Sequence, residues 1–137
     1  MKKVDEILKE RGKKYGSFLD NINNIDAISE FIEVKDDYNI VSKAPSFLIA
    51  LKLIRLGYIG KDFDYHCTKC FMERLKDEDS FIDLIGYIRL IVENRLSINF
   101  KEHKKIGQHY TLLKIAKKIY KRELKRQKDL ERILQND

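Results

Sequence analysis

The chain has 137 residues, of which 43% are hydrophobic and 36% charged, with one Pro and six Gly. This length suits one domain, and the composition excludes disordered and fibrous proteins. Low Pro and Gly content favours helices over an all-β fold, which would need more turns. The net charge of +6 is concentrated in residues 101–137, which hold 12 Lys and Arg against 5 Asp and Glu. Any prediction of nucleic-acid binding from the basic composition therefore concerns this tail.

Neither a membrane anchor nor a secretion signal is predicted. No apolar run approaches the roughly 20 residues that cross a bilayer, and residues 1–16 lack the apolar segment of a signal peptide. The two cysteines, Cys67 and Cys70, are too few and too close together for a disulfide framework. We therefore expect a soluble, cytoplasmic protein without a membrane partner.

Apolar residues at helical spacing predict helices over residues 2–12, 18–34, 45–56, 78–96 and 106–134. Gly12 is expected to end the first helix, and Ser17 to cap the second. Residues 45–56 are apolar nearly all round, which indicates a central helix. Two polar breaks, at residues 35–39 and 99–105, interrupt the pattern, and no segment shows the alternation of a strand.

The predicted fold class is therefore all-α. Residues 1–100 are expected to form a helical domain that holds the ligand-binding site. Residues 101–137 are expected to form a long basic C-terminal helix that either docks on this domain or projects from it. The segment 58–76, with His66 next to the Cys67–Cys70 pair, is the hardest to interpret. Because a second pair of metal ligands is missing, ordinary thiols are favoured there over zinc.

Three segments carry a resemblance to a known family: residues 7–21 (ILKERGKKYGSFLDN), 50–56 (ALKLIRL) and 79–88 (DSFIDLIGYI). Their order and spacing resemble a phage- and prophage-borne family of small domains related to the MazG-like, all-α nucleoside triphosphate pyrophosphohydrolases. The resemblance covers about residues 5–96. It implies a four-helix core that commonly assembles into oligomers, in which carboxylates on facing helices hold Mg²⁺ against the phosphates of a nucleotide.

The acidic residues match that family only in part. Its enzymes usually carry E-E-x-x-E on one core helix and E-x-x-D on the next, whereas residues 45–56 contain no acidic residue. Asp79 and Asp83 stand in for the second cluster, and Glu30 and Glu33 are candidates to replace the first. The depleted cluster favours nucleotide binding without turnover over hydrolysis.

Asp79, Asp83 and Tyr87 recur every four residues and so share one helix face. The two carboxylates form a plausible half of a Mg²⁺ site, completed by water and phosphate oxygens. Alternatively, the negative charge of Asp79 only stabilises the helix N-terminus, and Asp83 faces solvent. Lys52 and Arg55 lie one turn apart on an apolar helix, and each needs a negative partner there. That partner is either one of these aspartates or a ligand phosphate.

The residues around Gly16 offer a second anion site, because lysines there precede a predicted helix N-terminus. Tyr15 or Phe18 is expected to stack on a base, and Asn21 to contact a base edge or a ribose hydroxyl. The alternative is an ordinary turn between helices. The predicted nucleotide site comprises Lys14, Tyr15, Phe18, Asn21, Lys52, Arg55 and Tyr87, and the predicted metal site comprises Asp79 and Asp83.

In the tail, residues 114–132 place Lys and Arg on one helix face and apolar residues on the other. This pattern suits either nucleic-acid binding through phosphates or an oligomerisation helix with a solvated face, and we favour the second. The leading hypothesis is a homo-oligomer that binds and sequesters a nucleotide or nucleotide signal, in a phage anti-defence or nucleotide-pool role. The alternatives are a Mg²⁺-dependent (d)NTP pyrophosphohydrolase and a basic nucleic-acid-binding protein.

Overall fold

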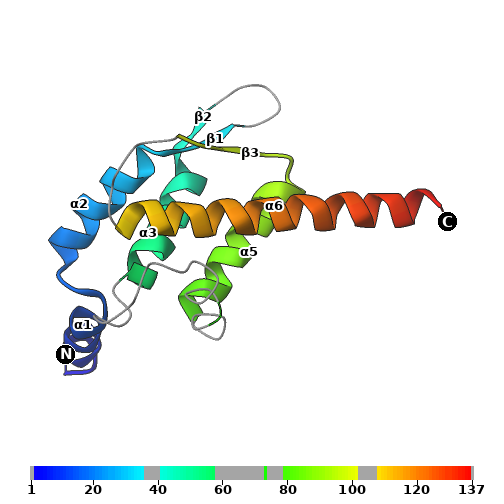
Figure 1. The fold of residues 1–137 in the computed structure, drawn as a ribbon. Helices are drawn as coiled ribbons and strands as arrows, with labels where there is room; N and C mark the ends of the chain where they lie inside the picture. The colour runs from blue at the N-terminus through cyan, green and yellow to red at the C-terminus, as the bar shows by residue number, and fades with distance from the viewer. Residues whose placement is uncertain (1, 36–40, 58–72, 74–78, 102–107, 137) are drawn as a thin grey trace.

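The computed structural model describes residues 2–35, 41–57, 73, 79–101 and 108–136, and most of them are helical (Figure 1). The helices are α1 (Lys2–Tyr15), α2 (Phe18–Ser29), α3 (Lys43–Gly57), α5 (Asp79–Glu93) and α6 (Gln108–Gln135). Three short strands, β1 (Ile32–Lys35), β2 (Val41–Ser42) and β3 (Ser97–Phe100), form an antiparallel sheet in the order β2-β1-β3. The helical class predicted from the sequence is confirmed. None of the described helices is both long and apolar enough to span a membrane.

The apolar core lies between α2, α3, α5 and the first half of α6, and the sheet covers one edge of it (Figure 1). Its largest fully buried side chains are Ile28, Val34, Ile49, Leu53, Leu56, Leu84, Ile88, Leu112, Ile115 and Ile119. Each such side chain stabilises the fold by about 1.5–3 kcal/mol through burial. Since α6 supplies several of them, its first half belongs to the same folded body as the preceding helices.

The first half of α6 docks on the body and the second half projects from it, so each of the two predicted alternatives describes one half. Residues 112–127 alternate between buried and exposed positions, whereas every residue from Lys128 to Asn136 is exposed. Figure 1 shows this second half extending beyond the body, on the side away from α1. A cut near residue 100 would therefore remove part of the core together with the basic tail.

The predicted helix over residues 18–34 is wrong at its end. Helix α2 stops at Ser29, and Ile32 and Val34 enter β1 with both side chains buried. The strand pairs with β3, and Lys101 at its end donates its N–H to the carbonyl of Phe31. Since β1 has only four residues, its alternation could not be distinguished from a continuing helical pattern. The predicted polar break at residues 99–105 likewise contains the end of β3.

Helix α5, predicted to reach Leu96, ends at Glu93 because Arg95 adopts a left-handed conformation with φ of 58°. The N–H of Leu96 bonds to the carbonyl of Ile91 at 2.9 Å, and that of Arg95 to the carbonyl of Val92 at 3.0 Å. These two bonds form a Schellman motif, which usually has glycine at the left-handed position.

The left-handed residue gives a first prediction. Arg95→Gly should raise the free energy of unfolding by about 0.5–1 kcal/mol, because glycine avoids the strain of this conformation at a smaller entropic cost. Urea denaturation measures the change. The matched control, Arg122→Gly on the exposed face of α6, should lower the free energy of unfolding by about 1 kcal/mol. Equal losses in both variants would contradict the assigned conformation.

The first helix ends later than predicted, and Gly16 instead of Gly12 forms the turn between α1 and α2. Helix α1 passes through Gly12 and ends at Tyr15, and Gly16 supplies the turn with φ of 83°. The predicted cap is confirmed, because the Ser17 hydroxyl accepts the N–H of Asp20 at 3.1 Å. Helix α1 itself has no buried residue. The placement of this turn beside the body therefore depends on the contacts described next.

Candidate functional site

A salt bridge joins α3 to α5 at the centre of the candidate site. The Lys52 Nζ lies 2.7 Å from the Asp83 Oδ2, and the two side chains are 9% and 48% exposed. A lysine this deeply buried needs a negative partner, because its desolvation is otherwise unfavourable. Of the alternatives left open by the sequence, the ion pair with Asp83 is therefore present, and the half-exposed carboxylate remains accessible from solvent.

The ring of Tyr15 lies beside two cations. The Arg55 Cζ is 5.0 Å from its centroid, and the Lys14 Nζ is 5.3 Å from it. Both distances suit a cation–π interaction. The contact with Arg55 connects the turn between α1 and α2 to the last turn of α3, so residues distant in the sequence form one cationic surface.

Asn21 holds this turn in place. Its Nδ2 donates to the carbonyl oxygens of Tyr15 at 2.7 Å and of Ser17 at 2.8 Å. Its Oδ1 is buried and has no hydrogen-bond partner among the described residues. Because both amide protons are engaged and the Oδ1 is buried, Asn21 positions the backbone that carries Tyr15.

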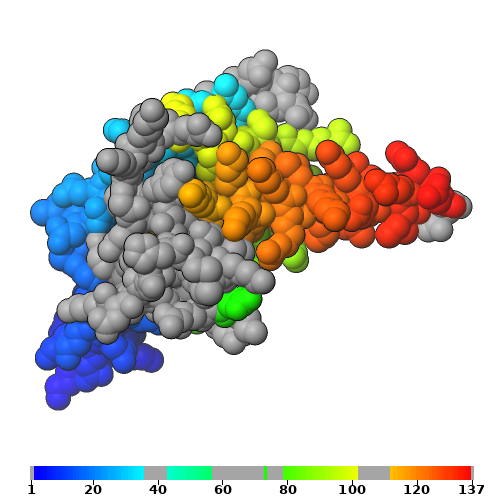
Figure 2. All heavy atoms as spheres, in the orientation of Figure 1, coloured from blue at the N-terminus to red at the C-terminus, as the bar shows by residue number. Residues whose placement is uncertain are grey.

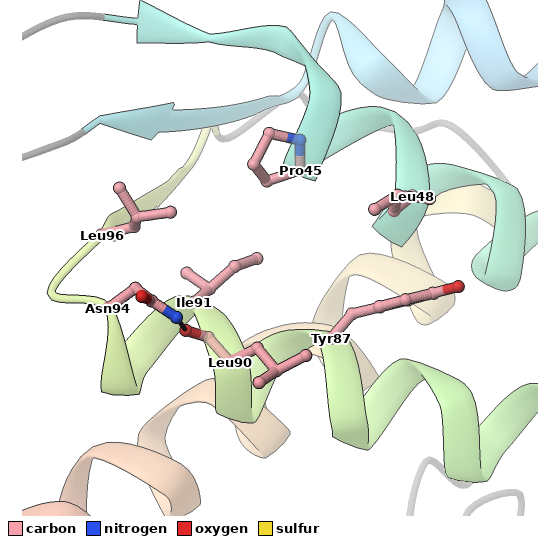
Figure 3. Close-up of a pocket in the computed structure, with 7 residues that line it drawn as sticks. All are labelled: Pro45, Leu48, Tyr87, Leu90, Ile91, Asn94 and Leu96. Carbon is pink, nitrogen blue, oxygen red and sulfur yellow. Dashed lines mark hydrogen bonds between the residues drawn. The ribbon is translucent and has the colours of Figure 1, made fainter.

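An apolar groove lies between α3 and α5. It encloses about 250 Å³ and is lined by Pro45, Leu48, Tyr87, Leu90, Ile91, Asn94 and Leu96. Figure 3 shows Leu48 and Tyr87 facing each other at one end, with Leu96 and Asn94 at the other. The side-chain amide of Asn94 donates to the carbonyl of Leu90 at 2.8 Å and is thereby engaged within α5. The rest of the lining is mostly hydrocarbon. A groove with this lining suits an apolar group.

The groove and the cations follow one another along the same surface. On α3, Leu48, Lys52 and Arg55 recur at helical spacing and share one face, over about 10 Å of helix axis. On α5, Asp83 lies one turn before Tyr87, which places the salt bridge next to the groove. The site thus changes from apolar at Leu48 to cationic at Arg55.

Two predicted residues lie apart from this arrangement. Phe18 is 82% exposed, at the first residue of α2. Asp79 is exposed at the first residue of α5. Tyr87 joins the site, but as part of the groove lining.

The magnesium half-site predicted on Asp79 and Asp83 stays a prediction. The Asp83 carboxylate is held by Lys52, and no group of three His, Cys, Asp or Glu side chains comes together in the described part of the chain. Glu33, a candidate substitute, lies on β1, and its hydrogen bond with Lys101 lowers the pKa of its carboxyl below the ordinary value. Glu30 is exposed at the end of α2. His66, Cys67 and Cys70 lie outside the described residues.

Sequence reasoning missed one buried polar network, centred on Glu123. This carboxylate is 3% exposed and accepts hydrogen bonds from Arg89 Nε at 3.2 Å and Arg126 Nε at 2.7 Å. Burial alone would raise the pKa of Glu123, but the two guanidinium groups outweigh it and lower the pKa. The network fastens α6 to α5. Its signal in the sequence is a glutamate four residues after Ile119, within the apolar stripe.

Comparison with models of protein families, with curated proteins and with solved structures finds no match to this chain. The MazG-like resemblance therefore stays a prediction based on three segments. In the structure these segments form the turn between α1 and α2, the second half of α3 and the first part of α5. The contact of Tyr15 with Arg55 joins the first to the second, and the salt bridge of Lys52 with Asp83 joins the second to the third.

Proposed function

We propose that this protein binds a phosphorylated nucleotide along the face shared by α3 and α5. The groove beside Leu48 and Tyr87 receives the base, and the cations of Lys52, Arg55 and Lys14 bind the phosphates. The single observation that carries this proposal is that the apolar groove lies next to the salt bridge of Lys52 with Asp83, on the helix face that also carries Arg55.

A ligand that uses the whole face must be apolar at one end and anionic at the other. A free phosphate would leave the groove empty, and an uncharged apolar molecule would gain nothing from Arg55. Arginine suits phosphate because its planar guanidinium donates two parallel hydrogen bonds. The separation of about 10 Å between Leu48 and Arg55 along the helix is comparable to the length of a nucleoside with its first phosphates.

Sequestration agrees better with these contacts than hydrolysis does. In a Mg²⁺-dependent pyrophosphohydrolase, carboxylates must face the metal, whereas Asp83 is paired with Lys52. That carboxylate is then a resident anion, which an incoming phosphate displaces from the lysine. The phage anti-defence or nucleotide-pool role is the part of the proposal that rests on the resemblance alone.

The test is calorimetric titration with nucleoside mono-, di- and triphosphates and cyclic dinucleotides, with and without Mg²⁺. Arg55→Ala should weaken nucleotide binding about tenfold or more, because it removes a charge-assisted bond. The control Arg122→Ala, on the exposed face of α6, should leave binding unchanged.

A change in the groove separates its role from that of the cations. Leu90→Asp places a charge in the apolar lining and should weaken the binding of nucleotides while leaving inorganic triphosphate unaffected. If no nucleotide binds, or if a folded Arg55→Ala variant keeps its affinity, the proposal is wrong. Release of pyrophosphate in the presence of Mg²⁺ would favour the hydrolase.

A further inference from the structure

A second surface, on the far side of α6 from the core, carries a row of cations. At about 100° per residue, seven exposed cations of this helix, beginning with Lys114, fall within a sector of about 100°. The six from Lys117 onward are Lys117, Lys118, Lys121, Lys125, Lys128 and Arg132. We call these six the α6 basic row. Figure 2 shows the outer surface of α6 reaching from the body to its projecting end.

The basic row has no partners within the described parts of the chain. Its cations take part in none of the ion pairs found there, whereas Arg89 and Arg126 are bonded to Glu123 on the opposite face. The two nearest exposed acids, Asp129 and Glu131, lie to either side of the row. About 22 Å of rigid helix thus presents only positive charge along one line.

We propose that the α6 basic row binds the phosphate backbone of a nucleic-acid duplex, independently of base sequence. A duplex carries one negative charge per about 1.7 Å of its axis, so a straight row of this length faces many phosphates at once. Binding releases the counterions condensed on them, which supplies the affinity. Because the backbone of α6 is already helical, only the side chains of the row lose conformational freedom on binding.

Two other partners fit this surface less well. Single strands are held by aromatic side chains that stack on bases, and the row contains none; Tyr120 packs instead against Phe100, with ring centroids 6.0 Å apart. A membrane surface requires a large exposed apolar face opposite the cations. On α6 the apolar face is buried against the core as far as Ile119, and the exposed apolar residues Leu130, Ile133 and Leu134 lie only at its end, so most of the row has no free apolar face behind it.

The experiment measures fluorescence anisotropy of labelled DNA and RNA duplexes of about 20 base pairs, titrated with the full chain across a range of salt concentrations. The wild type should bind, with log K falling against log salt with a slope of about −4 to −5. Changing Lys117, Lys121, Lys125 and Lys128 together to Gln should weaken binding more than about tenfold at 0.1 M salt and reduce the slope by about 3.

The matched control removes the same charge from α1, by changing Lys2, Lys3, Lys9 and Lys13 to Gln. These side chains are also exposed on a helix, which makes the charge change comparable. Because the α6 basic row stays intact, the control should keep most of the affinity for the duplex and nearly the full salt slope. Thermal unfolding by circular dichroism confirms that both variants fold. Equal losses of duplex affinity in the two variants would mean that net charge alone causes binding, and would overturn the proposal. So would single strands that bind as tightly as duplexes, or binding to anionic vesicles without binding to nucleic acid.

Discussion

An Arg89→Ala/Arg126→Ala variant should lose about 3–5 kcal/mol of unfolding free energy at neutral pH, the scale of a buried ion pair that loses its partners. Both guanidinium groups bond to the Glu123 carboxylate, which is 3% exposed. Without them, this carboxylate stays charged in an apolar stripe or must bind a proton to remain buried. Urea denaturation measures the loss.

The pH dependence identifies Glu123 as the cause. In the wild type its pKa is lowered below the ordinary 4.5, so it stabilises the fold above that value and the contribution is lost as the pH falls through the folded-state pKa. In the double variant, burial without cations should raise the pKa. The variant then recovers stability as acid neutralises the carboxyl, and the difference from the wild type should shrink toward low pH.

Two further variants make this prediction specific. Adding Glu123→Leu to the double variant removes the unpaired charge and should restore most of the lost stability, because apolar replacements of buried ion pairs are often neutral. Arg122→Ala/Arg132→Ala removes two exposed cations from the same helix and should change stability by less than about 1 kcal/mol. If the Glu123→Leu change brings no recovery, the loss comes from packing of the arginine stems.

The sequence predicted the helices where their apolar stripes are long. Residues 45–56 and 78–96 correspond to α3 and α5 within a few positions, because ten or more residues define a period. The strands were missed because four residues or fewer are too short to define a period of two. The end of α5 was missed because Arg95 takes a conformation usually left to glycine, and the sequence gives no sign that it will.

The candidate site was predictable in its charges but not in its contacts. Two cations on an apolar helix were expected to meet anions; Lys52 meets Asp83, whereas Arg55 lies against the ring of Tyr15. The position of Tyr15 against Arg55 depends on how α1 is placed beside α3, which no local pattern encodes. Likewise, whether Tyr87 faces a phosphate or an apolar groove depends on Leu48 across the helix interface.

The last prediction concerns Asp83, where folding and binding should respond with opposite signs. Asp83→Asn removes the negative partner of a lysine that is 9% exposed, and should lower the free energy of unfolding by about 1–3 kcal/mol, less than for a fully buried pair because Asp83 itself is half-exposed. The same change removes the anion that competes with phosphate for Lys52. Nucleotide affinity should therefore rise, by about tenfold if the pair contributes about 1.4 kcal/mol of competition.

Urea denaturation and calorimetric titration of the same preparation test both signs. Asp79→Asn is the matched control, because it removes an equal charge one turn away without breaking the salt bridge, and it should leave stability nearly unchanged and raise affinity only slightly. A magnesium role for the two aspartates predicts the reverse: affinity would fall in both variants, and its dependence on Mg²⁺ would be lost. An Asp83→Asn variant that is less stable yet binds nucleotide more tightly is the outcome expected if Asp83 holds the place of the phosphate.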